Sequence, residues 1–207
     1  MINSKITFNV VFPGITDMLN VSNEIEKEKD KLVSVIEKEA KKYEFSEEKF
    51  KEELRPWFRV AIKTIFSIID AVCFQTKKHI LIVRQEIKGE SIDKKTKEKL
   101  QEFRINEKGK KEKIYLRIKE NIKFTLKELY KLYGNKLDLS KDYKELNLLK
   151  KSIVVRNSIT HPKKIENLEV GAEDYQDAVN VLHWFSEKFG KGLKGKVKIT
   201  GKPSYMK

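Results

Sequence analysis

The sequence predicts an all-α protein, a helical bundle of about five or six helices, with a short β-pair formed by the two termini as an optional addition. Apolar residues recur every three or four positions over several long segments, as on one face of a helix. Hydrophobic residues make up 39% of the chain, enough for a core, and charged residues make up 37%, which suits exposed helix faces. Alternation of apolar and polar residues, typical of strands, occurs near the two ends of the chain.

The N-terminal segment predicts a short strand and then a helix. The strand carries apolar residues at alternate positions, Ile6, Phe8 and Val10, and Pro13-Gly14 ends it. Asn23 and Glu26 have the spacing of a capping pair at a helix start. The helix that follows has one apolar side, made of Leu32, Val35 or Ile36, Ala40 and Tyr43.

A long apolar helix should form the centre of the bundle. Ser46 precedes two glutamates and predicts a helix start. Pro56 interrupts this segment, so either the main helix begins there or the helix kinks there. The helix should run to about Glu86, and its broad apolar surface places it at the centre. Its most apolar window, from Trp57 to Phe74, contains three charges, which favours a core helix over a membrane span.

Two more helices and their connections are expected after a loop at residues 89–93. Lys94 to Ile105 predicts a weak helix anchored by Leu100 and Phe103. Residues 106–110 are polar and contain a glycine, which indicates a flexible connection. Lys111 to Tyr133 predicts a strongly amphipathic helix with Gly134 as its stop. Its apolar stripe is Ile114, Ile118, Ile122, Leu126, Leu129 and Tyr133.

The last two helices bring the chain to its basic tail. Ser140 can cap a helix whose inward residues include Leu149, and residues 173–189 predict a final helix that Gly190 follows. We therefore expect three parts: an N-terminal strand and helix packed on the bundle (residues 1–45), the bundle (46–189) and a basic tail (190–207). In the tail, Val197 and Ile199 alternate with lysines. This segment can pair with the N-terminal strand, which we favour slightly, or form a disordered basic arm.

Charge and cysteine content narrow the class of protein. The 45 Lys and Arg against 31 Asp and Glu give a net charge of +14. Such an excess favours a phosphate-rich partner, although solvated lysines without any partner explain the bulk charge equally well. Cys73 is the only cysteine, so no intrachain disulfide can form, which fits a reducing compartment. Residues 1–14 lack the pattern of a signal peptide, and we expect a cytoplasmic protein with no membrane partner.

The most informative motif is Arg156-Asn157-Ser158-Ile159-Thr160-His161, which closes the helix that begins near Ser140. It resembles the signature of the HEPN family, in which an arginine and a polar residue precede a histidine at this spacing. The resemblance implies a helical bundle with metal-independent ribonuclease activity, no cofactor, and a homodimer that brings two motifs together. It also suggests a defence or toxin–antitoxin role with a regulatory protein as partner. Some such toxins carry a modified tyrosine two residues after the histidine, where this chain has Lys163, so that regulation is not expected.

The three motif residues suit metal-free cleavage of RNA. The 2′-hydroxyl is the nucleophile, so a base must remove its proton and an acid must protonate the leaving 5′ oxygen; His161 can perform either task. Arg156 can stabilise the extra negative charge of the phosphorane with its planar donors. Asn157 can donate to phosphate or fix the tautomer of the histidine. The alternative without a site is that Arg156 pairs with a carboxylate, Asn157 caps the helix, and His161 lies on the surface.

Helical geometry limits how these residues can meet. Asn157 and His161 are four residues apart and share a helix face. Arg156 and His161 are five apart, so on a straight helix they point about 140° apart, at roughly 100° per residue. Pro162 disfavours helical dihedrals at His161, so the helix can end there and let the side chains converge. Otherwise, Arg156 of one chain must meet His161 of another in a symmetric dimer.

Several supporting residues are expected around the motif. Asp70 is a carboxylate in an apolar run, so it either pairs with Arg156 or orients His161, or it pairs with a lysine or faces water. The lysines that can line an RNA groove, or form an ordinary solvated face, are Lys150, Lys151, Lys163 and Lys164. His79 and His183 are expected to be packing residues, and no metal site is expected from the histidine and cysteine spacing. The alternative functions are a non-catalytic HEPN-like module that binds RNA or nucleotides, and a protein-interaction module.

Overall fold

The structure is a computed structural model, and it describes residues 34, 38 and 47–194. The chain divides into two compact units, residues 1–42 and 43–207, and the description below concerns residues 47–194. The predicted N-terminal strand and the apolar side of the first predicted helix lie outside the described residues, as does the predicted pairing of Val197 and Ile199 with that strand.

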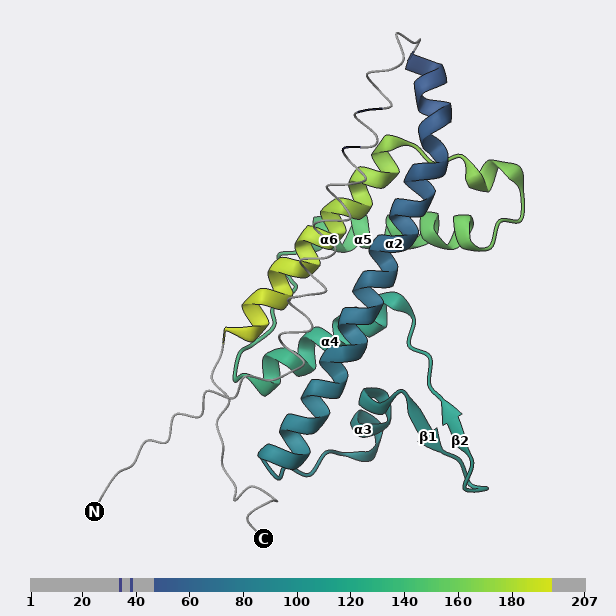
Figure 1. Cartoon of the computed structure of the whole chain (residues 1–207). Coiled ribbons are helices and arrows are strands. Elements are labelled where there is room, and N and C mark those ends of the chain that lie inside the picture. The colour runs from purple at the N-terminus through teal and green to yellow at the C-terminus, as the bar shows by residue number, and fades with distance from the viewer. Residues whose placement is uncertain (1–33, 35–37, 39–46, 195–207) are drawn as a thin grey trace. The chain divides into compact units, whose positions relative to one another are not determined.

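The described residues form a helical bundle with one short β-pair, so the predicted fold class is confirmed (Figure 1). The β-pair is internal to the chain and does not involve the termini. In chain order the elements are α2 (Glu47–Ile82), the π-helical turn η1 (Val83–Ile87), α3 (Lys94–Gln101), β1 (Phe103–Ile105), β2 (Lys111–Lys113), α4 (Ile118–Leu132), α5 (Tyr143–Thr160), the 3-10 turn η2 (Ile165–Leu168) and α6 (Ala172–Leu193).

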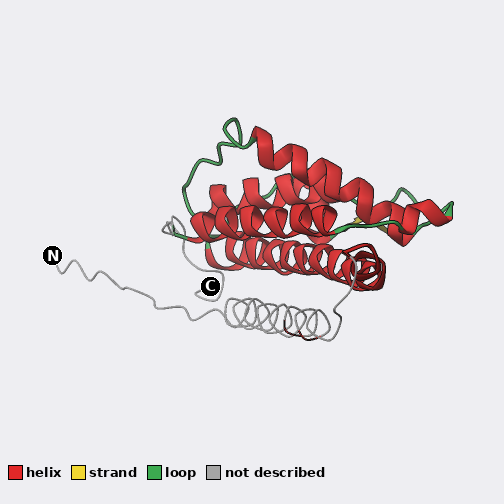
Figure 2. Ribbon diagram, turned by 90° about the horizontal axis from the view of Figure 1, so that it is seen from above, coloured by secondary structure: helices red, strands yellow, loops and turns green. Residues whose placement is uncertain are grey.

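Helix α2 forms the centre of the bundle, as its apolar surface predicts. It packs against α3, α4, α5 and α6, and the helices lie against one another in Figure 2. Ile62, Phe66 and Ile69 of α2 are fully buried. Near its N-terminal end the rings of Phe58 and Tyr175 stack with centroids 5.6 Å apart, which joins α2 to α6. No helix among the described residues is long and apolar enough to cross a membrane.

Helix α2 begins at Glu47, directly after the predicted start at Ser46, and runs through Pro56. Of the two alternatives at Pro56, a start of the main helix there is therefore wrong. Packing along the rest of this long helix can offset the one hydrogen bond that proline removes. The helix ends close to the predicted Glu86, because η1 continues it as far as Ile87.

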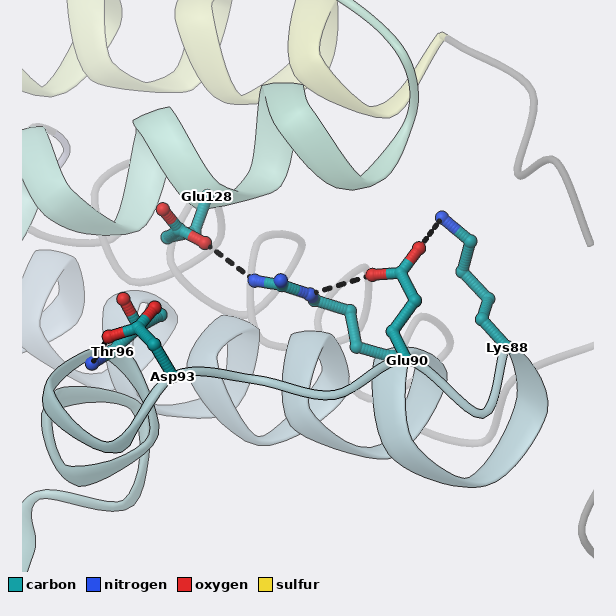
Figure 3. A network of polar contacts seen from close by, with 6 residues as sticks. Lys88, Glu90, Asp93, Thr96 and Glu128 are labelled. Carbon is teal, nitrogen blue, oxygen red and sulfur yellow. Dashed lines mark hydrogen bonds and ion pairs between the residues drawn. The ribbon is translucent and has the colours of Figure 1, made fainter. Parts of the chain in front are cut away.

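A buried arginine lies at the end of this helix. Arg84 is only 7% exposed, and its Nη1 donates to Glu128 of α4 at 2.9 Å. Its Nε donates to Glu90 at 3.0 Å, and Lys88 pairs with the same carboxylate at 2.6 Å (Figure 3). These contacts fix the loop after η1 against α4. A polar cluster therefore closes this end of the bundle.

A β-hairpin replaces parts of two predicted helices. The weak helix ends at Gln101 and not at Ile105, because Glu102 adopts a left-handed conformation (φ 59°) and the chain then enters β1. The strands are antiparallel in the register Phe103↔Lys113, Arg104↔Glu112 and Ile105↔Lys111. The predicted connection at 106–110 is the turn of this hairpin, and Asn106 Oδ1 accepts from the backbone N–H groups of Lys108 and Lys110. The prediction of a helix from Lys111 is wrong, since α4 begins only at Ile118.

The last two helices differ from prediction at their ends. Gly134 follows the end of α4 with φ 74°, as predicted for a stop. Ser140 is not a cap, because α5 begins at Tyr143 with Asp142 at the N-cap position. Helix α6 passes through Gly190 and ends at Leu193, so Gly190 does not stop it.

Candidate functional site

The motif lies at the C-terminal end of α5, where the helix breaks as Pro162 predicts. Thr160 is the last helical residue, and His161 has φ −130° and ψ 64°, outside the helical region. The backbone N–H of His161 still donates to the carbonyl of Asn157 at 2.9 Å. The imidazole is therefore carried just past the helix end by a defined backbone, and the side chain is exposed.

Arg156 and Asn157 bind one another. Arg156 Nη1 donates to Asn157 Oδ1 at 3.1 Å, and Arg156 is half-buried while Asn157 is exposed. The Thr160 hydroxyl donates to the Arg156 carbonyl at 2.6 Å. Within residues 47–194, no hydrogen bond joins Arg156 to His161. Asn157 thus uses its carbonyl oxygen to orient the guanidinium and not to fix the histidine.

Asp70 lies near Arg156 but does not pair with it. Burial raises the pKa of Asp70, while a hydrogen bond from Asn121 Nδ2 at 3.4 Å and then the positive charge of Arg156 lower it. No ion pair within 4 Å joins these two side chains in the part of the chain that the structure describes. The carboxylate of Asp70 therefore acts on Arg156 through space, and Asn121, not His161, is its hydrogen-bond partner. The hypothesis that Asp70 orients His161 has no contact in its favour.

A buried lysine that the sequence analysis did not single out is linked to Asp70 through Asn121. Lys77 is 1% exposed, and its Nζ donates to Asn121 Oδ1 at 2.7 Å and to Glu102 Oε1 at 2.5 Å. Asn121 of α4 therefore connects two residues of α2, Lys77 and Asp70. Lys77 also binds Glu102, which directly precedes the hairpin. The available signal was the position of Lys77, which lies four residues after the buried Cys73 and three before the buried Ile80, on the inner face of α2.

The four predicted RNA-binding lysines differ in their environments. Lys151 pairs with Glu173 at 2.9 Å and with Asp177 at 2.8 Å, and hydrogen bonds to these carboxylates raise its pKa. Its charge is thus compensated by α6. The other three predicted lysines, Lys150, Lys163 and Lys164, are exposed and have no carboxylate partner among the described residues.

The two remaining histidines are not part of the site. His79 is half-buried, its Nε2 lies 3.0 Å from the hydroxyl of Tyr133, and burial lowers its pKa, as expected for a packing residue. His183 is exposed on α6, so it is not the packing residue that the sequence predicts.

Comparisons of the chain with protein-family models, with curated proteins and with solved structures found no match. The resemblance to the HEPN family therefore depends on the motif and on the helical fold of this chain.

Proposed function

We propose that this protein is a HEPN-like endoribonuclease that cleaves RNA without a metal ion, using Arg156, Asn157 and His161. One observation carries the proposal: His161 is exposed immediately beyond the end of α5, five residues after Arg156, whose guanidinium donates to Asn157 at 3.1 Å. An exposed imidazole can transfer a proton and an oriented arginine can bind the phosphorane, and cleavage by the 2′-hydroxyl uses both functions.

In this proposal each side chain has one task. His161 transfers a proton to or from the reacting oxygens, which is worth about 100- to 10,000-fold in rate. Arg156 donates to the phosphorane oxygens, and the bond from Arg156 to Asn157 reduces the freedom that the guanidinium loses on binding. The half-buried carboxylate of Asp70 has a positioning role, because its attraction favours the orientation of Arg156 toward α2.

A homodimer is part of the proposal. One chain supplies one motif histidine, while the reaction needs both an acid and a base, and a two-fold axis supplies two histidines to one cleft. Two large apolar side chains close to the motif in sequence, Val154 and Ile165, are 59% and 82% exposed. Exposed apolar groups of this kind favour burial in a contact with a second copy. A role in defence or toxin–antitoxin biology, with a regulatory protein as a further partner, is implied by the family resemblance.

The test is an RNA cleavage assay in EDTA with the purified full-length chain. His161→Ala and Arg156→Ala should each reduce cleavage at least about 100-fold. The matched control is His183→Ala, which removes an exposed histidine from α6 and should leave cleavage unchanged. Cleavage that survives His161→Ala contradicts the proposal. Salt-sensitive RNA binding without any cleavage supports a non-catalytic RNA-binding module, which the missing contact between Arg156 and His161 within one chain also favours.

A further inference from the structure

The β1–β2 hairpin has two chemically different faces. Alternate residues of a strand point to opposite sides of a sheet, so the observed register places Phe103, Ile105, Lys111 and Lys113 on one face and Arg104 and Glu112 on the other. In Figure 1 the hairpin extends away from the helices. We call the first set, with Tyr115 two residues beyond Lys113, the lysine face of the hairpin.

The lysines of this face are not neutralised. On the opposite face, Arg104 pairs with Glu112 at 3.0 Å, and Asn106 donates to the same carboxylate at 2.8 Å. Neither Lys111 nor Lys113 has a carboxylate partner within residues 47–194, and both are exposed. The hairpin thus pairs the cation of one face and leaves the two cations of the other available for an external anion.

Aromatic rings accompany these two lysines. Lys111 Nζ lies 3.8 Å from the centroid of the Phe103 ring, and Lys113 Nζ lies 4.8 Å from that of Tyr115. Tyr115 is 78% exposed, and Ile105 on the same face is 54% exposed. An exposed ring beside ammonium groups is the combination that binds single-stranded nucleic acid, in which the lysines contact phosphates and the ring stacks on an unpaired base.

The region around the hairpin is rich in basic residues. The segment from Lys94 to Lys119 contains eleven Lys or Arg residues and four Glu, a net charge of +7, which is half of the +14 of the whole chain. Such a local excess raises the concentration of polyanions near the hairpin and accelerates their association.

We propose that the lysine face of the hairpin is an arm that binds single-stranded RNA, with Lys111 and Lys113 on successive phosphates and Tyr115 stacked on a base. The proposal rests on the proposed function for the choice of RNA, and it adds a binding site that is separate from the lysines next to the motif. An unpaired strand is the fitting ligand because the ring of Tyr115 can stack only on a base that is not already stacked in a duplex.

Binding is measured by fluorescence anisotropy with a labelled oligouridine of about 12 nucleotides, within the usual site size of such proteins. All proteins carry His161→Ala, so that the probe is not cut. The test variant is K111Q/K113Q, and the matched control K127Q/K131Q removes two exposed lysines from α4. Loss of two phosphate contacts should lower the slope of log Kd against log salt by about 1.4, at about 0.7 per contact for a single strand, whereas the control should keep the slope.

A second pair of variants tests whether Tyr115 stacks on a base. Tyr115→Ala should weaken binding at least about fivefold, and Tyr143→Ala, which removes a ring that is 75% exposed on α5, should not. The proposal is refuted if K111Q/K113Q and K127Q/K131Q lower the salt slope equally, or if Tyr115→Ala leaves Kd unchanged. It is also refuted if inorganic polyphosphate competes for the protein as well as unlabelled oligouridine does. The cleavage assay separates failure of this proposal from failure of the ribonuclease proposal. If K111Q/K113Q with intact His161 cleaves RNA as well as the unaltered chain, only the proposed RNA binding by the hairpin is refuted. If the unaltered chain binds oligouridine but does not cleave RNA, only the ribonuclease proposal is refuted.

Discussion

Replacing Glu128 should destabilise the protein strongly, because it leaves a buried arginine short of one partner. Glu128 is 6% exposed, and its Oε2 lies 2.9 Å from Nη1 of Arg84, which is 7% exposed (Figure 3). Removing one partner of a buried ion pair costs about 3–5 kcal/mol. Because Glu90 stays bound to Nε of Arg84 at 3.0 Å, we expect the lower end, about 3 kcal/mol, for Glu128→Leu.

This loss should appear as a fall in Tm. For a chain of this size, 1 kcal/mol corresponds to about 2–4 °C, so Tm should fall by about 6–12 °C. Circular dichroism at the helical signal measures it. The control Glu187→Leu removes an exposed carboxylate that pairs with Lys191 and should leave Tm unchanged.

A double variant tests the cause of the loss. In Arg84→Met with Glu128→Leu, no uncompensated charge remains, so most of the lost Tm should return. The reasoning is refuted if Glu128→Leu lowers Tm no more than Glu187→Leu, or if the double variant is less stable than the Glu128→Leu single variant.

Three further predictions concern Gly192, Cys73 and Asp70. A Cβ at Gly192 would lie 2.8 Å from the ring of the buried Tyr130, so Gly192→Ala should lower Tm, while Gly190→Ala, with nothing within 4 Å, should raise it because alanine favours helix by about 1 kcal/mol. Burial raises the pKa of the Cys73 thiol to about 12, so iodoacetamide should not alkylate the native protein near neutral pH, and rapid alkylation without denaturant would contradict this. Burial also raises the pKa of Asp70, so ionisation opposes folding: the contribution of Asp70 to stability is present at low pH and is lost as pH rises through its folded pKa. Asp70→Asn should therefore raise Tm at neutral pH and lose this advantage in acid, and an equal Tm shift at every pH would exclude it.

Apolar periodicity was sufficient to predict the bundle and its central helix. The broad apolar surface of α2 is buried against four other helices, and Gly134 ends α4 as expected. The hairpin was not predictable in the same way. Its strands have three residues each, too few for alternation to be distinguished from a helical pattern, and Phe103 looked like a helix anchor. The left-handed residue that ends α3 is Glu102 and not a glycine, so no local signal marked the change.

The motif could be found from the sequence, but its contacts could not. Pro162 correctly predicted the break after Thr160. The choice of partners depends on tertiary packing: Lys151 turned out to be neutralised by two carboxylates of α6, and Asp70 to be bound by Asn121 of α4. A single sequence shows neither pairing, because each joins helices whose relative positions follow from packing of the whole bundle.

The chemistry of the cleaved ends tests the central claim most directly. Attack by the 2′-hydroxyl leaves a 2′,3′-cyclic phosphate and a 5′-hydroxyl, so a DNA strand with one ribonucleotide, incubated with the protein in EDTA, should be cut only at that ribonucleotide. We predict these ends for the unaltered chain and no product for His161→Ala. Products with a 5′-phosphate, or the same ends from His161→Ala, would contradict the account.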